Sequence, residues 1–299
     1  MLNMWPTDII ARIEGGLGNQ LFQYAAARTL ADRLGCDLML DLRGLEANGD
    51  RPYMLQGYRI RATLASDELL QALPLARSTR WGRMRSRIAQ TVPSLFSFPV
   101  FWPQSFAYDR RFERISRPVF LVGYWQSEKY FHWNRNRILA DLQLMAVDVV
   151  NLPLCEQIRN CNSVALHVRR GDYVSNAPAA AYHGLCDLSY YQIAIANLYM
   201  YEPDIHVFVF SDDLAWVKAN LKLNVPLYFV EGDSGQQAYI DLELMSHCRH
   251  HVIANSSFSW WGAWRGNAPD QRVYAPAQWF SDPETDTSDV VPIRWNRQD

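Results

Sequence analysis

The chain has 299 residues, of which 49% are hydrophobic and 20% are charged. This is enough for a sizeable core and, at roughly 150 residues per domain, for two domains. The 29 Lys and Arg residues against 31 Asp and Glu give a net charge of −2, so no basic field indicates a nucleic acid partner.

The five cysteines are odd in number, scattered, and form no CxxC pair. This pattern is typical of thiols in a reducing cytoplasm rather than of a disulfide framework. The first residues show no signal-peptide pattern, and no run approaches the roughly 18 apolar residues that span a bilayer. We therefore expect a cytoplasmic protein that touches a membrane at its surface at most.

Residues 8–13 predict a first strand, and a glycine turn with Gly15, Gly16 and Gly18 follows it. An amphipathic helix is then expected, because apolar residues recur every four positions from Phe22 to Leu34. Gly35 is a suitable C-cap, and residues 37–40 predict a second strand. A strand, a glycine turn and a helix together form a backbone cradle for an anion.

Several interpretations of this turn compete. Gly16 and Gly18 fit a dinucleotide fingerprint, but Leu21 replaces its third glycine. A phosphate-binding P-loop is excluded, since no Gly-Lys-Ser/Thr is present. The turn could instead approach a diphosphate or a sugar closely, or it could be a tight turn without a ligand.

Residues 42–62 are expected to be a loop, and Ser66 to cap a short helix. Residues 77–87 contain five arginines, Trp81 and no acid. They predict either a solvated basic helix or a patch for anionic lipid or a phosphorylated acceptor carrier.

A buried strand is predicted at 118–122, and it leads into Trp125 and Gln126. Aromatic and amide side chains after a strand suit a network of sugar hydroxyls, although a core aromatic cluster explains the same residues.

The second half of the chain is more regular. Strands are predicted at 163–169, 205–210, 225–230, 251–254 and 272–275, with helices at 189–201, 213–222, 236–248 and 257–265. Five strands, most of them separated by helices, indicate a doubly wound parallel sheet. We expect the domain boundary near 145–155.

The first of these strands ends in a dense polar cluster that contains His167, Arg169, Arg170 and Asp172. Ligands of open parallel sheets bind at the carboxyl edge of the strands. Two arginines, a histidine and an acid are costly to bury, so the cluster predicts an anionic partner. A surface ion-pair cluster is the alternative.

Two further strand ends carry candidate chemistry. Asp212 and Asp213 follow the strand at 205–210, where an acid could accept hydrogen bonds from guanine or cap the next helix. They do not form the spaced DxD of metal-dependent glycosyltransferases. Ser256, Ser257 and Phe258 begin a helix whose N–H groups could bind phosphate, or they could be a plain cap.

Five segments together resemble the bacterial α-1,2-fucosyltransferases of glycosyltransferase family 11. They are GGLGNQLFQYA at 15–25, GYWQSEKYF at 123–131, HVRRGDY at 167–173, FSDD at 210–213 and NSSFSWWGAW at 255–264. The resemblance implies a GT-B architecture, in which two Rossmann-like α/β domains face each other across a cleft. Residues 1–150 would form the acceptor-side domain, and residues 151–299 the GDP-fucose domain.

The resemblance also implies inverting, metal-independent transfer of fucose from GDP-fucose to the 2-hydroxyl of a galactose-terminated oligosaccharide or lipid-linked glycan, without a cofactor. Expected catalytic residues are Arg169, Asp172 and His167. Asp172 is the first candidate base, with His167 and Glu14 behind it, or Asp172 orients an arginine. Acceptor contacts are expected at Trp125, Gln126 and Tyr173. Donor contacts are expected at Gly16, Gly18, Asn19, Arg169, Asp212, Asp213, Ser256, Ser257 and Phe258.

Within the same resemblance, a fucosyltransferase that forms another linkage is an alternative. The same features also leave two rival functions of other kinds. One is a GDP-sugar epimerase or reductase that uses NAD, against which Leu21 counts. The other is a non-catalytic carbohydrate-binding protein, which has no need of an arginine-rich strand end.

Overall fold

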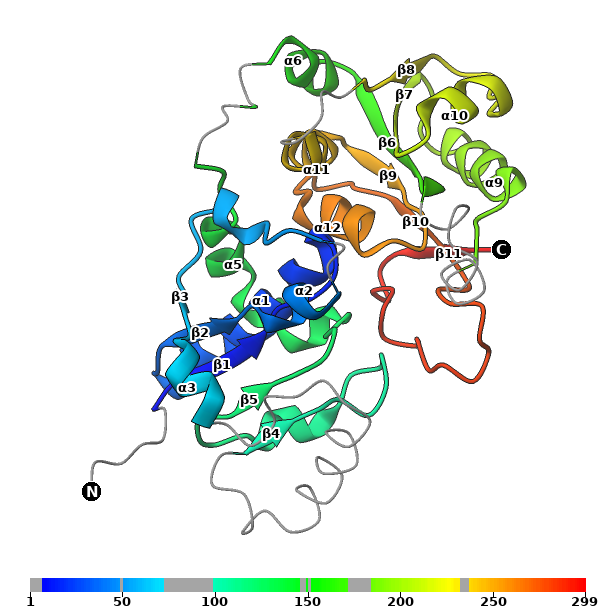
Figure 1. The fold of residues 1–299 in the computed structure, drawn as a ribbon. Helices are drawn as coiled ribbons and strands as arrows, with labels where there is room; N and C mark the ends of the chain where they lie inside the picture. The colour runs from blue at the N-terminus through cyan, green and yellow to red at the C-terminus, as the bar shows by residue number, and fades with distance from the viewer. Residues whose placement is uncertain are drawn as a thin grey trace, which may run out of the picture. The chain divides into compact units, whose positions relative to one another are not determined.

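The computed structural model describes residues 7–48, 51–72, 99–145, 149, 152–171, 184–231 and 237–299. The chain divides into two compact units, Met1–Gln143 (unit 1) and Leu144–Asp299 (unit 2). Each unit contains its own parallel β-sheet (Figure 1). No helix among the described residues is long and apolar enough to cross a bilayer.

The sheet of unit 1 has five parallel strands in the order β3-β2-β1-β5-β4. Their bounds are β1 (Ile9–Arg12), β2 (Leu38–Asp41), β3 (Thr63–Leu64), β4 (Val100–Phe101) and β5 (Phe120–Leu121). The register pairs Arg12 with Asp41 at the carboxyl ends of β1 and β2, where their side chains form a buried ion pair of 2.9 Å.

The helices of unit 1 are α1 (Leu17–Leu34), α2 (Arg43–Asn48), α3 (Asp67–Ala72) and α5 (Arg135–Asp141). The described residues of unit 1 also form the 3-10 turns η1 (Leu55–Gly57), η3 (Arg110–Arg114), η4 (Glu128–Tyr130) and η5 (His132–Asn134). The loop expected at 42–62 therefore contains a helix and a 3-10 turn. The α2 helix begins there because the Asp41 carboxylate accepts a hydrogen bond from the Arg43 N–H at 3.1 Å.

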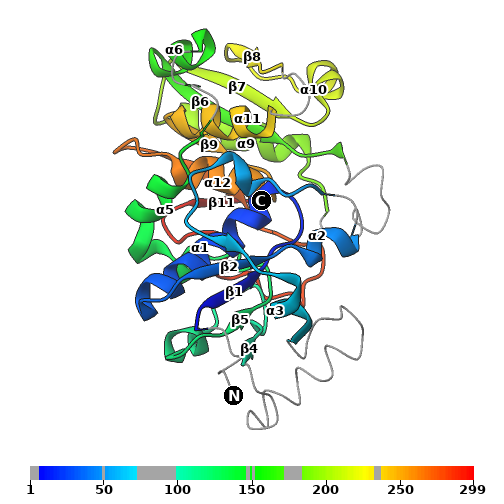
Figure 2. The ribbon, with the colours of Figure 1, turned by 60° about the vertical axis from the view of Figure 1, so that its left-hand side comes forward.

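Helix α1 packs on β1 and β2 (Figure 2) and ends at Gly35, whose left-handed φ of 66° confirms the predicted C-cap. The predicted amphipathic pattern is wrong, because the helix is buried on all its faces up to Ala31. Its buried polar side chains have specific partners. Gln20 donates to the carbonyls of Gly15 and Pro52, and Tyr24 donates to Asp141.

The sheet of unit 2 has six parallel strands in the order β11-β10-β9-β6-β7-β8. Their bounds are β6 (Asn162–Val168), β7 (Ile205–Ser211), β8 (Leu227–Phe229), β9 (His250–Val252), β10 (Val273–Pro276) and β11 (Asn296–Gln298). Five of them confirm predicted strands. The sequence did not predict β11, which has no apolar residue.

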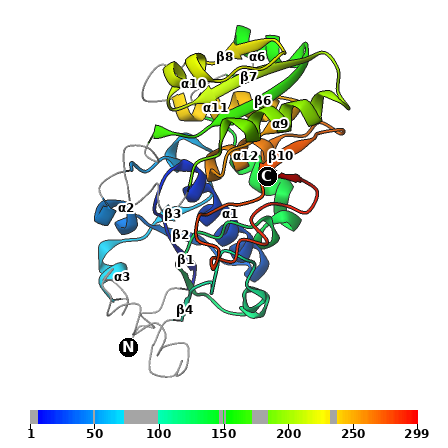
Figure 3. The ribbon, with the colours of Figure 1, turned by 90° about the vertical axis from the view of Figure 1, so that its right-hand side faces the viewer.

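The helices of unit 2 are α6 (Pro153–Arg159), α9 (Leu188–Tyr199), α10 (Leu214–Asn220), α11 (Gln237–His247) and α12 (Ser257–Arg265). They lie along both faces of the sheet (Figure 3), as the doubly wound pattern predicts.

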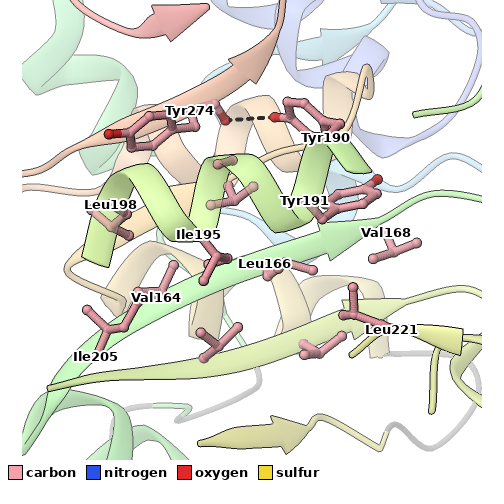
Figure 4. Close-up of a cluster of buried hydrophobic side chains, with 14 of the residues drawn as sticks. Val164, Leu166, Val168, Tyr190, Tyr191, Ile195, Leu198, Ile205, Leu221 and Tyr274 are labelled. Carbon is pink, nitrogen blue, oxygen red and sulfur yellow. Dashed lines mark hydrogen bonds between the residues drawn. The ribbon is translucent and has the colours of Figure 1, made fainter. Parts of the chain in front are cut away.

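The two faces of β6 contact different helices. Val164, Leu166 and Val168 pack with α9 and α10 (Figure 4). Ala165 packs on the other face with α6 and α11. Alternation along the strand therefore directs His167 to the face opposite α9.

Candidate functional site

The carboxyl edge of the unit 2 sheet collects the polar segments predicted to bind the donor. Strands β9, β6 and β7 are neighbours in the sheet and run in the same direction. The residues that follow them therefore emerge at one edge. These are the segments at 169–171, 212–213 and 255–258.

Asp212 joins two parts of the β6 end. Its Oδ2 lies 2.9 Å from Nη1 of Arg169, and its Oδ1 accepts a hydrogen bond of 2.8 Å from the backbone N–H of Arg170. A carboxylate has about four acceptor positions, so Asp212 retains capacity for a ligand. Asp212 thus orients the arginine that was predicted to hold the phosphate.

Arg170 is fixed separately from Arg169. Its guanidinium carbon lies 3.4 Å from the centroid of the Trp216 ring, and its Nε lies 3.4 Å from Oδ2 of Asp213. The other oxygen of Asp213 accepts a hydrogen bond from the backbone N–H of Trp216 and so caps α10. The sequence left a capping role open for Asp212, but the structure gives the N-cap position to Asp213 instead. The contact between the Trp216 ring and Arg170 was not predicted, because a single tryptophan in a helix does not indicate a cation partner.

Position 171 must be a glycine because Asp212 lies too close to leave room for a side chain there. A Cβ atom at this position would lie 2.5 Å from Oδ2 of Asp212. That distance is below any real contact, so a side chain here would displace the carboxylate that holds Arg169.

His167 is buried beside the start of α12. Its side chain packs on Phe258, with ring centroids 5.6 Å apart, and the residue is 4% exposed. Burial, together with the nearby Arg169 charge, lowers the pKa of His167 to about 4, although Asp212 opposes the shift. The ring is therefore neutral at pH 7. The proton-transfer role predicted for His167 does not fit these surroundings, because a buried ring of such low basicity cannot readily accept a proton from a sugar hydroxyl.

The N-terminus of α12 lies beside this cluster without a side-chain cap. Ser256 is the N-cap residue and is 6% exposed, but its hydroxyl makes no capping hydrogen bond, and no acidic residue lies in the first turn. Uncapped N–H groups and the positive end of the helix dipole favour an anion. A plain cap, the alternative left open by the sequence, does not describe this geometry.

A polar pocket of about 300 Å³ lies at the same edge, after β9, β10 and β11. Asn255, Gln278 and Gln298 contribute to its lining. The Asn255 amide donates to the carbonyls of Trp279 and Gly184 at 3.3 and 3.4 Å, so it ties two loops together. A polar hollow of this size suits a sugar ring.

Among the residues that the structure describes, no group of three His, Cys, Asp or Glu side chains is placed to hold a metal ion. Asp212 and Asp213 point to different partners, as expected for adjacent residues. His251 is a buried core residue, and its Nε2 lies 2.8 Å from the Met245 carbonyl oxygen.

The predicted glycine turn of unit 1 has the geometry for close approach. Gly15 has a left-handed φ of 76°, and Gly16 is the N-cap of α1 without a side-chain cap. A Cβ at Gly16 would meet no atom within 4 Å, so its outer side is open. Gly18 is buried in the first turn of the helix.

Asn19 connects this turn to the segment predicted to bind the acceptor. Its Oδ1 accepts a hydrogen bond of 2.9 Å from the Gln126 amide. A residue predicted for the donor and one predicted for the acceptor are thus in direct contact within unit 1.

Trp125 does not offer a stacking face. It is 2% exposed, and its ring packs on Phe101, Phe112 and Tyr130. The core-cluster alternative therefore describes this residue, and the predicted contact with an acceptor does not fit its burial. The neighbouring Tyr124 is 36% exposed and stacks on Phe106, so it is the better-placed aromatic side chain.

Glu14 follows β1 at the same edge of the unit 1 sheet. Burial raises the pKa of Glu14, Asp41 adds to the rise, and Arg12 opposes it. A carboxyl group whose pKa is raised toward neutrality is a better base. Asp172, Tyr173 and the 77–87 segment lie outside the described residues.

Two parallel-sheet α/β domains define the GT-B class of glycosyltransferases, and solved structures share this fold. A crystal structure of the α-1,6-fucosyltransferase NodZ soaked with GDP-fucose matches with a TM-score of 0.51 and 17% identity, over 88% of this chain and 93% of that one. A crystal structure of fucosyltransferase NodZ from Bradyrhizobium matches with a TM-score of 0.50 and 16% identity, over 86% and 91% of the two chains.

The chain belongs to glycosyltransferase family 11, whose model matches residues 106–298. It is 31% identical to an α-1,2-colitosyltransferase of Escherichia coli, over 97% of this chain and 98% of that protein. It is also 31% identical to the O-antigen biosynthesis glycosyltransferase WbnK of Escherichia coli, over 90% and 94%. A rabbit (Oryctolagus cuniculus) galactoside α-(1,2)-fucosyltransferase 2 matches at 26%, over 87% and 66%. The protein is therefore a glycosyltransferase.

Proposed function

We propose that this protein transfers L-fucose from GDP-fucose to the 2-hydroxyl of a terminal galactose, with inversion and without a metal. The observation that supports this most is the meeting of Arg169 and the uncapped α12 N-terminus at one edge of a family 11 domain. In this proposal unit 2 binds the donor, and unit 1 binds the acceptor.

The leaving diphosphate would be held by Arg169 and by the first N–H groups of α12, with Ser256, Ser257 and Phe258 around it. Negative charge grows on the GDP as its bond to fucose breaks. A guanidinium and a helix N-terminus that are already in place stabilise that charge without reorganisation. Asp212 keeps Arg169 in position, and Trp216 with Asp213 does the same for Arg170.

Asp212 is also the better-placed of the two acids for the guanine. Asp213 uses one oxygen to cap α10 and the other to pair with Arg170. Asp212 keeps acceptor capacity beyond its two contacts. An Asp212→Asn variant should therefore lose preference for GDP over ADP, while Asp213→Asn should mainly lower stability.

The chemical step is a single displacement. The 2-hydroxyl oxygen of galactose forms a bond to C1 of fucose, the bond from C1 to the β-phosphate oxygen breaks, and GDP leaves with that electron pair. The hydroxyl proton passes to a base. No covalent enzyme intermediate is needed.

Asp172 and Glu14 are the candidate bases. The sequence placed Glu14 behind Asp172 as a candidate base. Its raised pKa and its position at the sheet edge make Glu14 a stronger candidate than that ranking. Comparison of GDP-fucose hydrolysis with transfer to lactose in Asp172→Asn and Glu14→Gln separates them. The base variant should lose transfer by about 10²-fold or more without losing donor affinity, whereas a variant that only disturbs donor binding should lose affinity for GDP-fucose as well.

The central experiment incubates the protein with GDP-fucose and lactose and measures GDP release, with linkage analysis of the product. Arg169→Ala should reduce kcat by about 10²–10³-fold, as for loss of one preorganised charge-stabilising group. Excess EDTA should leave the rate unchanged. An unaltered rate in Arg169→Ala, or a product without a 1→2 linkage, would contradict the proposal.

A second donor is favoured by one relative, the colitosyltransferase that is 31% identical over nearly the whole chain. Colitose differs from fucose by lacking the 3-hydroxyl. A site that hydrogen-bonds this hydroxyl should reject GDP-colitose by about 10⁴-fold, whereas a site that excludes it should prefer GDP-colitose. The ratio of kcat/KM for the two donors decides between them.

A further inference from the structure

Unit 1 contains a cavity that is separate from the polar pocket of unit 2. It has a volume of about 580 Å³ and is lined entirely by residues between positions 33 and 133. Its lining comes from the last turn of α1, from η3, and from the η4 and η5 turns. A cavity of this volume can hold a ligand of the size of an oligosaccharide fragment.

The cavity is distant from the glycine turn. Arg33 lies in the last turn of α1, whereas Gly16 begins the same helix. An 18-residue helix is about 27 Å long, so the two sites lie at opposite ends of α1. A ligand in this cavity is therefore not the sugar that reacts at the turn.

The charged lining of the cavity is mainly basic. Arg33, Arg110 and Lys129 contribute positive charges, and Glu113 is the one acid among the lining residues. The Glu113 carboxylate accepts a hydrogen bond of 3.0 Å from the Tyr108 hydroxyl. The balance favours an anion.

Both arginines of the lining lack a carboxylate partner in the part of the chain that the structure describes. Arg33 donates only to the carbonyls of Phe112 and Ile115, at 2.8 and 3.1 Å. Arg110 forms no hydrogen bond or ion pair there. A guanidinium without a carboxylate can receive one from a ligand in bidentate geometry.

Aromatic rings complete the site. Phe112 and Tyr130 are buried lining residues whose rings meet edge to face at 5.0 Å. Trp133 is also part of the lining and is 55% exposed. An exposed indole next to cationic groups provides an apolar face for a sugar ring beside donors for its acidic group.

We infer that this cavity is a binding site for an acidic saccharide, a sugar that carries a carboxylate or a phosphate. It would hold such a sugar through Arg33, Arg110 and Lys129, with Trp133 against the ring. The inference concerns binding alone and does not depend on the transfer reaction proposed above.

The test measures binding to the full chain by calorimetry with three probes: trigalacturonate, galactose 6-phosphate and neutral galactotriose. At least one acidic probe should bind, with galactotriose about tenfold weaker or undetectable, because it lacks the charge-assisted contacts. Arg110→Ala and Trp133→Ala should each weaken the acidic probe by about tenfold. The acidic probe that binds better identifies the acidic group.

Arg114→Ala is the matched control, because Arg114 is an exposed arginine of the same η3 turn that does not line the cavity. It should bind like the wild type. Arg110→Lys should keep part of the affinity lost in Arg110→Ala. Equal binding by Arg110→Ala and Arg114→Ala overturns the inference, as does the absence of binding by either acidic probe. Binding of inorganic phosphate, with no binding of any of the three saccharides, also overturns it.

Discussion

At the scale of single residues, Asp212 connects the ends of two strands that are far apart in sequence. It holds the Arg169 side chain and the Arg170 backbone, and it lies where a side chain on Gly171 would be. Three consecutive residues of the HVRRGDY segment thus depend on one carboxylate. A change at any of them should act through the position of Arg169.

Gly171→Ala should damage the site without unfolding the protein. The new Cβ would lie 2.5 Å from Oδ2 of Asp212, so the carboxylate must move away from Arg169. We expect GDP affinity to fall by about tenfold or more, the worth of one charge-assisted contact. Calorimetry with GDP gives the affinity, and far-UV circular dichroism gives the fold.

A double-mutant cycle with Asp212→Ala checks the cause. Without the Asp212 carboxylate, the alanine at 171 has room, so the double variant should be no worse than Asp212→Ala alone. Additive losses would mean that Gly171 acts through something other than Asp212.

Gly16→Ala is expected to separate stability from activity. A Cβ here meets nothing within 4 Å and φ is −73°, so the melting temperature should stay within about 2 °C of the wild type. Transfer should still fall if the space beside the turn holds substrate. A variant with full activity would show that this space is not used.

At the scale of elements, two helices of unit 2 begin in different ways. Asp213 caps α10 through the Trp216 N–H, whereas Ser256 stands at the N-cap of α12 without a capping hydrogen bond. One N-terminus is therefore closed by the protein, and the other has N–H groups left for a ligand. Substitution of the N-cap residue can therefore be compared between α10 and α12, with one helix as the control for the other.

Ser256→Ala should leave stability nearly unchanged, although replacement of an N-cap serine usually costs about 1 kcal/mol. Asp213→Ala should cost that amount or more, since a capping bond and an ion pair are lost. Donor KM should rise in Ser256→Ala if its hydroxyl contacts the diphosphate. Chemical denaturation gives the stabilities, and a marked loss of stability in Ser256→Ala would contradict the open N-terminus.

The start of β9 should make stability depend on pH. Burial lowers the pKa of His251 to about 4 in the fold, while an unfolded histidine titrates near 6.5. Below pH 6.5 the unfolded chain gains a proton that the folded chain does not, so the free energy of unfolding falls as the pH drops from 6.5 to 4. His167 acts in the same direction.

Urea denaturation at pH 7.5, 6 and 5 measures this effect. His251→Gln removes one titrating ring and should flatten the curve, even if it lowers the stability at every pH. An unchanged slope in this variant would rule out His251 as a source.

At the scale of the whole molecule, the sequence predicts the strands that are apolar runs and misses several short strands that lack such a run. Strands β6 and β7 are apolar runs, so local pattern identifies them. Strands β3, β4 and β11 have two or three residues each and exist because a neighbouring strand pairs with them. Likewise, the burial of Gln20 and Tyr24 depends on partners at Pro52 and Asp141, which no local pattern shows.

The site follows the same division. Parallel strands predict that Arg169, Asp212 and Ser256 share an edge. That Asp212 pairs with Arg169 and Trp216 stacks on Arg170 depends on side-chain geometry, which sequence spacing does not carry. The burial of Trp125 could not be predicted either, because an aromatic residue in this motif fits a sugar-binding surface and a core cluster equally well.

Each unit has its own sheet, and unit 2 has an apolar cluster on each face of that sheet. A fragment of residues 144–299 should therefore fold cooperatively and bind GDP, since Arg169, Asp212 and the α12 N-terminus all belong to it. If the glycine turn of unit 1 also contacts the diphosphate, the fragment should bind about tenfold more weakly than the full chain. Calorimetry with GDP on the fragment, its Arg169→Ala variant and the full chain measures this. A folded fragment that does not bind GDP would contradict the assignment of the donor to unit 2, and equal affinity of fragment and full chain would exclude a contribution from the turn.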